Sequence, residues 1–135
     1  MHPKLAKFIM VCEDHPGAKL NPEFKAAWLA ALRSGEYTQG RDVLMTPGDP
    51  DRHCCLGVAC VITKREIRPM QSLPESADWR SWGFTSRTAN EDIGGALAGM
   101  NDGIAEERDA DNTLCGEEVP GLSFAEIADA IEKHL

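Results

Sequence analysis

The segment His53-Cys54-Cys55-Leu56-Gly57-Val58-Ala59-Cys60 places three of the chain's five cysteines within seven positions. Cysteine and histidine can bind a metal, form a thiol active site, or pack inside a protein as small groups. The valines favour a strand, whereas positions 56, 59, 60 and 63 share one face of a helix. We predict a helix over residues 56–63, with Cys55 and Cys60 buried in a core.

A metal site and a thiol site are the alternatives for this segment. Structural zinc takes four nitrogen or sulfur ligands, usually from C-x2-4-C pairs, and the chain has no C-x-x-C pair. A thiol nucleophile needs a base within reach and an electropositive setting, and nothing marks a third group that would orient His53. We therefore predict no catalytic residue, no metal and no cofactor. A small Cys/His metal-binding protein or thiol enzyme using residues 53–60 stays open as the alternative.

Length and composition indicate one domain spanning residues 1–135. No apolar run approaches the ~20 residues that cross a bilayer, and the run at residues 8–12 is too short for a signal peptide. An odd number of cysteines without an export signal is typical of free thiols in a reducing cytoplasm. The net charge of -8 disfavours direct contact with nucleic acid, which requires a basic face. We expect a cytoplasmic protein without membrane contact.

Helical patterns dominate both ends of the chain. Residues 3–12 carry apolar side chains at helical spacing, and Asn21-Pro22-Glu23 reads as the start of a second helix that Gly35 ends. Thr88 to Glu91 and Ser123 to Glu126 match capping boxes of two later helices. Glycines 94, 95 and 99 fall inside the first of these, where close packing would explain them.

The middle of the chain predicts a β-hairpin and a long irregular segment. Residues 37–45 read as a strand, the next six are dense in turn formers, and residues 52–55 would return as the second strand. Residues 67–87 look irregular, with aromatic side chains that pin a loop onto the core. The fold class is α+β: a small single domain, mostly helical with one β-hairpin.

One hydrophobic core should join these helices. Its predicted members come from three helical patterns: Phe24, Trp28, Leu32, Leu97, Phe124, Ile127 and Ile131.

Several segments resemble a family of small phage and prophage proteins of unknown function. Residues 28–40 fit W-x-x-A-L-R-S-G-x-Y-x-Q-G, and residues 54–60 fit C-C-L-G-V-x-C. Met100-Asn101-Asp102 and the segment 121–132 (GLSFAEIADAIE) follow in the same order. The resemblance implies a phage accessory gene and a location in the host bacterial cell. It brings no catalytic residues, and between Asn101-Asp102 and Gly121 the chain carries an acidic insertion that we expect to be much shorter in relatives.

That insertion carries most of the net charge. Residues 102–118 hold seven acids and one base, Arg108, and should form a long surface connection between the last two helices. A field of this sign steers a basic partner into contact. We hypothesise a non-enzymatic inhibitor of a host or anti-phage defence protein with a basic surface; an oligomeric structural accessory protein and a merely solubilising loop are alternatives. The predicted partner-binding residues are Glu106, Glu107, Asp109, Asp111, Glu117 and Glu118.

Overall fold

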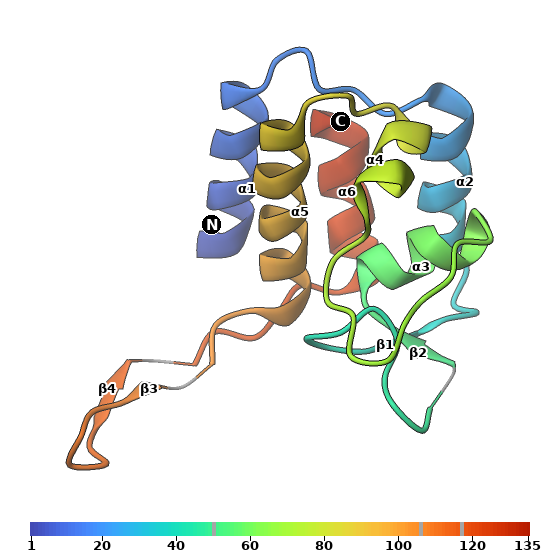
Figure 1. Ribbon diagram of the computed structural model, residues 1–135. Helices are drawn as coiled ribbons and strands as arrows, with labels where there is room; N and C mark the ends of the chain where they lie inside the picture. The colour runs from blue at the N-terminus through green and yellow to red at the C-terminus, as the bar shows by residue number, and fades with distance from the viewer. Residues whose placement is uncertain (50, 106, 117) are drawn as a thin grey trace.

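A computed structural model describes residues 1–49, 51–105, 107–116 and 118–135. Half of them lie in helices and few lie in strands, so the domain is mainly helical, as the sequence predicts. The helices are α1 (Pro3–Asp14), α2 (Pro22–Arg33), α3 (Cys55–Ile62), α4 (Ser76–Trp82), α5 (Arg87–Asp102) and α6 (Phe124–His134). Helix α1 packs on α5, α6 packs against α5 and α2, and α3 lies across the lower ends of α2 and α5 (Figure 1).

The core is one continuous cluster of buried side chains, and all seven predicted core residues belong to it. Trp28, Ile127 and Ile131 have no exposed surface. The rings of Phe24, Trp28, Trp79, Trp82 and Phe84 form a chain of stacked and edge-on contacts under α4. The aromatic residues of the segment 67–87 therefore do pin it onto the core, as expected.

The small sheet in the middle of the chain is parallel, whereas the sequence predicts a hairpin. Strand β1 (Thr38–Gln39) runs parallel to β2 (Arg52–His53), whereas the isolated Met45–His53 bridge is antiparallel. The intervening chain leaves the strand path because Leu44 is fully buried and its amide donates to the Gln71 carbonyl at 2.8 Å. A second pair, β3 (Glu107–Arg108) and β4 (Leu114–Gly116), is antiparallel and lies within the acidic insertion.

Two helix starts differ from expectation. Helix α4 lies in the segment that we expected to be irregular, and its capping box uses Glu75 and Asp78. Helix α5 begins at Arg87 with Ser86 as its cap, so the predicted Thr88 capping box is wrong. Helix α2 starts as predicted, with Asn21 as its N-cap residue and Pro22 as its first residue, although the Asn21 side-chain amide donates to the Ser81 carbonyl and makes no capping hydrogen bond. The second predicted capping box, Ser123 with Glu126, is confirmed.

Candidate functional site

The cysteine segment is part of the core. Cys54 caps α3, accepting a hydrogen bond on Sγ from the Gly57 amide at 3.4 Å, and Cys55 and Cys60 lie inside the helix that follows. Cys54, Cys55 and Cys60 are at most 4 % exposed. Burial in apolar surroundings raises the pKa of Cys54 to about 11 and that of Cys60 to about 12, and also raises the pKa of Cys55. The predicted burial is confirmed, and these thiols stay protonated at neutral pH.

The geometry around these thiols is that of a packed core. Cys55 donates through Sγ to the Leu97 carbonyl at 3.7 Å, and its own carbonyl accepts from the Trp28 indole at 3.0 Å. His53 lies against Tyr37, and its Nδ1 has no hydrogen-bond partner. Within the described ranges, no three His, Cys, Asp or Glu side chains are grouped so that they could hold a metal ion.

Asn101 is the centre of a buried polar network. It has no exposed surface, and its Oδ1 accepts from the Gln39 side chain at 2.9 Å and from the Cys55 amide at 3.1 Å. Its Nδ2 donates to the Gly40 carbonyl at 2.8 Å and to the Asp102 carboxylate at 2.9 Å. A buried carboxamide satisfied in this way fixes one relative placement of the segments that it joins.

This network joins segments that lie far apart in the sequence. Gln39 also donates to the Leu122 carbonyl at 2.8 Å, and Arg41 donates to the Asn101 carbonyl. Gly121 lies so close to that carbonyl that a Cβ atom would collide with it. The segments around residues 28–40, 54–60, 100–102 and 121–123 therefore meet at one internal junction. Their hydrogen bonds hold these segments together in the fold.

The acidic insertion forms a projecting hairpin, which we call the acidic arm (residues 105–118). The arm leaves the lower end of α5 and extends away from the helical body (Figure 1). At its base, Ile104 and Val119 exchange two backbone hydrogen bonds of 2.7 and 2.9 Å. The surface position is as expected, but the antiparallel β3–β4 pair corrects the expectation of a connection without secondary structure.

The predicted contact residues lie on this arm where they are described. Asp109, Asp111 and Glu118 are exposed, and Glu107 is the first residue of β3. Glu106 and Glu117 fall outside the described residues. Asp109 also shapes the turn, because its Oδ1 accepts from the amides of Asp111 and Thr113 at 3.0 and 2.9 Å. Leu114 on β4 is 51 % exposed, so the arm presents an apolar side chain among its charges.

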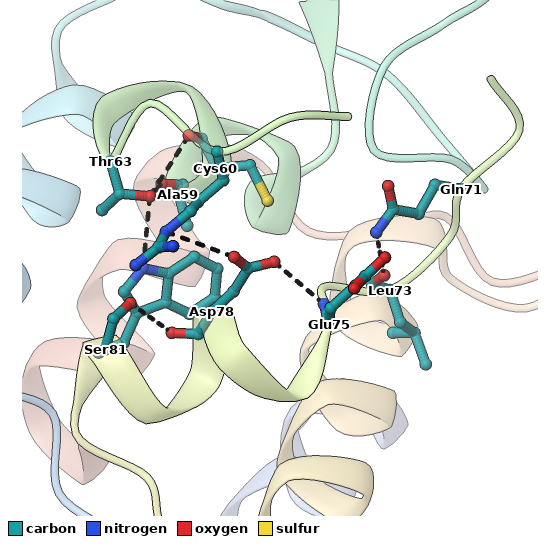
Figure 2. Close-up of polar contacts among 10 residues, drawn as sticks. Ala59, Cys60, Thr63, Gln71, Leu73, Glu75, Asp78 and Ser81 are labelled. Carbon is teal, nitrogen blue, oxygen red and sulfur yellow. Dashed lines mark hydrogen bonds and ion pairs between the residues drawn. The ribbon is translucent and has the colours of Figure 1, made fainter. Parts of the chain in front are cut away.

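Sequence reasoning missed a second polar cluster at the start of α4. The Asp78 carboxylate accepts from the Glu75 amide at 3.0 Å and lies 3.4 Å from the Arg65 guanidinium. Figure 2 shows Asp78 facing the end of α3, where the Thr63 hydroxyl donates to the Ala59 carbonyl. The sequence feature that could have predicted this cluster is the spacing Glu75-x-x-Asp78 directly after Pro74. It forms a capping box whose first residue is Glu instead of the usual Ser or Thr.

Comparison with known proteins gives one family match. In the described part of the chain, no helix combines the length and the apolar character that a bilayer span requires. No curated protein and no solved structure matches the chain. Residues 20–82, which contain α2, β1, β2, α3 and α4 but not the acidic arm, match the model of a domain of unknown function, DUF8296. Over these residues, the chain is similar to that family.

Proposed function

We propose that this protein is a phage-encoded, non-enzymatic binding protein that inhibits a host or anti-phage defence protein through its acidic arm. The observation that carries the proposal is the arm itself: a two-stranded projection that holds its charges away from the helical body (Figure 1). Six of the eight net negative charges come from residues 102–118. The phage origin rests on the sequence resemblance alone.

The arm suits a basic protein surface on physical grounds. A cluster of like charges on a projection produces a local field that raises the rate of encounter with an opposite charge. An isolated two-stranded hairpin is marginally stable in water, so a partner that packs on it would supply stability that the arm lacks alone. The exposed Leu114 offers an apolar anchor inside the charged rim, the arrangement common at protein interfaces.

The core supports a non-enzymatic role. Cys54, Cys55 and Cys60 have raised pKa values because they are buried, so little nucleophilic thiolate forms near pH 7. The alternative of a thiol enzyme built on residues 53–60 therefore lacks an activated nucleophile.

The test is an arm variant with a matched control. Glu107→Gln, Asp109→Asn, Asp111→Asn and Glu118→Gln together remove four charges, and the amide oxygen introduced at position 109 can still accept the turn hydrogen bonds. The control, Glu13→Gln, Asp14→Asn, Glu23→Gln and Glu36→Gln, removes four charges from exposed positions of the body. Each protein is immobilised, and bound proteins from bacterial lysate are quantified at low and high salt.

The proposal expects proteins with basic surfaces to be retained by the wild type and the control, to be lost with the arm variant, and to elute at high salt. The retained protein must then bind purified wild type directly and lose its own activity. Equal retention by all three proteins, or retention of nothing by the wild type, would show that the arm only adds solubility.

A further inference from the structure

The chain between α3 and α4 forms a strap, a name that we use for residues 64–73. In Figure 1 the strap descends from the end of α3, passes β1 and β2, and rises to α4. The structure describes every residue of the strap; none of them is buried, and only Ile67 and Gln71 are half-buried. A segment with so little buried apolar surface can open while the rest of a protein stays folded.

The middle of the strap is tied to the segment beside β1 and β2. The Gln71 carbonyl accepts from the Leu44 amide at 2.8 Å, and the Ile67 side chain packs against the core. Within the strap, the Arg68 amide donates to the Gln71 side chain at 3.0 Å, and the Gln71 amide donates to the Arg68 carbonyl at 3.1 Å. Gln71 thus takes part both in the turn and in the bond to Leu44, so these contacts should break together.

Asp78 fastens the strap to α4. Its side chain is 10 % exposed, and its carboxylate lies 3.4 Å from the Arg65 guanidinium. The same carboxylate accepts from the Glu75 amide at 3.0 Å (Figure 2). A second ion pair, between Arg68 and Glu75, has side chains that are 65 % and 56 % exposed, so it contributes little. The Arg65–Asp78 pair is therefore the stronger charged contact of the strap.

The closed strap holds backbone strain. Lys64 at its start and Met70 near its end have φ of +57° and +63°, in the left-handed region that residues with side chains rarely adopt. Asp42, two residues before Leu44, has φ of +69°. Opening would let these residues return to ordinary conformations, so the strain opposes the contacts that keep the strap closed.

We propose that the strap opens and closes as one unit while the helices stay folded, and that the Arg65–Asp78 ion pair is its latch. The hydrogen bond from Leu44 to Gln71 breaks in the open state. Asp78 keeps its bond to the Glu75 amide, so α4 stays in place. Salt favours opening because it screens the latch. This device lies between α3 and α4 and does not depend on the acidic arm.

Native-state hydrogen exchange of the full chain, followed by NMR at neutral pH, measures the opening. The amides of Leu44, Arg68 and Gln71 report on the strap, and the amide of the fully buried Leu97 in α5 reports on the helical body. The three strap amides should share one protection factor, about tenfold or more below that of Leu97. Raising the salt concentration from about 20 mM to about 500 mM should lower this shared factor about two- to fivefold.

Two variants of the latch and one control test its role. Asp78→Asn removes the charge, but its side-chain oxygen can still accept from the Glu75 amide; the shared protection factor should fall about tenfold. Arg65→Gln changes the exposed partner, should lower the factor about three- to tenfold, and keeps the test open if Asp78→Asn does not fold. Asp129→Asn removes a carboxylate that pairs with the Arg33 guanidinium at 2.7 Å, and should leave the strap amides unchanged.

Exchange of the strap amides at the rate of Leu97, or with protection factors that differ from one another more than about threefold, would overturn the proposal. A shared factor that neither latch variant lowers would also overturn it. An equal fall at Leu97 would show that the ion pair supports the whole body and is no latch. Replacing the acidic arm should leave strap exchange unchanged, so failure here would not affect the proposed function.

Discussion

Asn101 shows how much of this fold depends on one side chain. Its carboxamide oxygen accepts two hydrogen bonds and its carboxamide nitrogen donates two. The motif Met100-Asn101-Asp102 is visible in the sequence, but its role is not, because three of the four partners of Asn101 lie 46 to 62 residues away. No local pattern encodes a contact of that kind.

Asn101→Asp should destabilise the protein by about 3–5 kcal/mol. The change keeps the shape but replaces two donors with a buried carboxylate that faces the Asp102 carboxylate and the Gly40 carbonyl. Urea unfolding measures the loss, which should shrink at low pH as the new carboxyl group is protonated. Asn112→Asp, at an exposed position of the arm, is the control and should change stability by less than about 0.5 kcal/mol. Equal losses of stability in the two variants would show that the hydrogen bonds of Asn101 are not important for the fold.

The cysteines should divide into one reactive thiol and four protected ones. Cys115 is exposed, and the other four are buried; for Cys12, burial raises the pKa to about 11. A chromogenic disulfide reagent at pH 7 should therefore titrate one thiol quickly, and all five only in denaturant. Cys115→Ser should abolish the fast phase. A fast second thiol would reopen the thiol-enzyme alternative.

Stability should fall as the pH falls through the range in which histidine titrates. Burial lowers the pKa of His53 below its ordinary value of 6.5, so the unfolded chain takes up the proton first. The stability is complete above that value and is lost progressively as the pH falls toward the folded-state pKa. His134 contributes in the same direction, again through burial.

Urea unfolding between pH 7.5 and 5.5 measures this effect. His53→Phe should flatten the profile more than His134→Gln, because His53 is the more deeply buried side chain. An unchanged slope in His53→Phe would assign the pH dependence to other groups.

Among the elements, helix α5 allows a test in which neighbouring positions differ only in packing. A Cβ atom on Gly94 would lie 2.9 Å from Cζ2 of Trp79, whereas a Cβ atom on Gly95 would meet nothing within 4 Å. Both changes to Ala gain about 1 kcal/mol of helix propensity. Gly95→Ala should therefore stabilise the protein by about 0.5–1 kcal/mol, and Gly94→Ala should destabilise it by about 1–3 kcal/mol. Thermal unfolding of both variants measures the difference. Equal shifts in melting temperature would mean that the Trp79 ring can move to accommodate the added methyl group.

The elements also show where sequence patterns succeed. Helices α2 and α6 were predictable because apolar spacing and a terminal signal agree, including Gly35, whose φ is +77°. Helix α4 was not, since its capping residue is Glu75 and its seven residues are too few for a clear period. The parallel β1–β2 pair was hidden because burial of Leu44, not the turn sequence, decides the path of the chain.

For the whole molecule, the helical body should be independent of the arm. Ile104 and Val119 pair through two backbone hydrogen bonds where the arm joins the helical body, and we call this pair the neck. Replacing residues 105–118 with a two-residue Asn-Gly turn should change the stability of the body by less than about 1 kcal/mol, because a shorter loop costs less entropy to close. Thermal unfolding and helical circular dichroism measure this directly. A molten or unfolded product would show that the arm supports the core.

The surface position of the acidic arm was predictable from its charge, but its hairpin form was not. Strands β3 and β4 have two and three residues, which leaves too short an alternation of side chains to read from the sequence.

The neck has an evolutionary consequence. Because the chain leaves and re-enters the body at one paired position, the length of what lies between has little influence on folding: each doubling costs only about 0.6 kcal/mol. The segment between Ile104 and Val119 can therefore change in length and sequence while the helical body keeps its fold. Homologues should keep the residues on either side of this bridge, such as Gly103 and Gly121, and diverge in length and charge between them. A lineage could in this way change the surface of the molecule without changing its core.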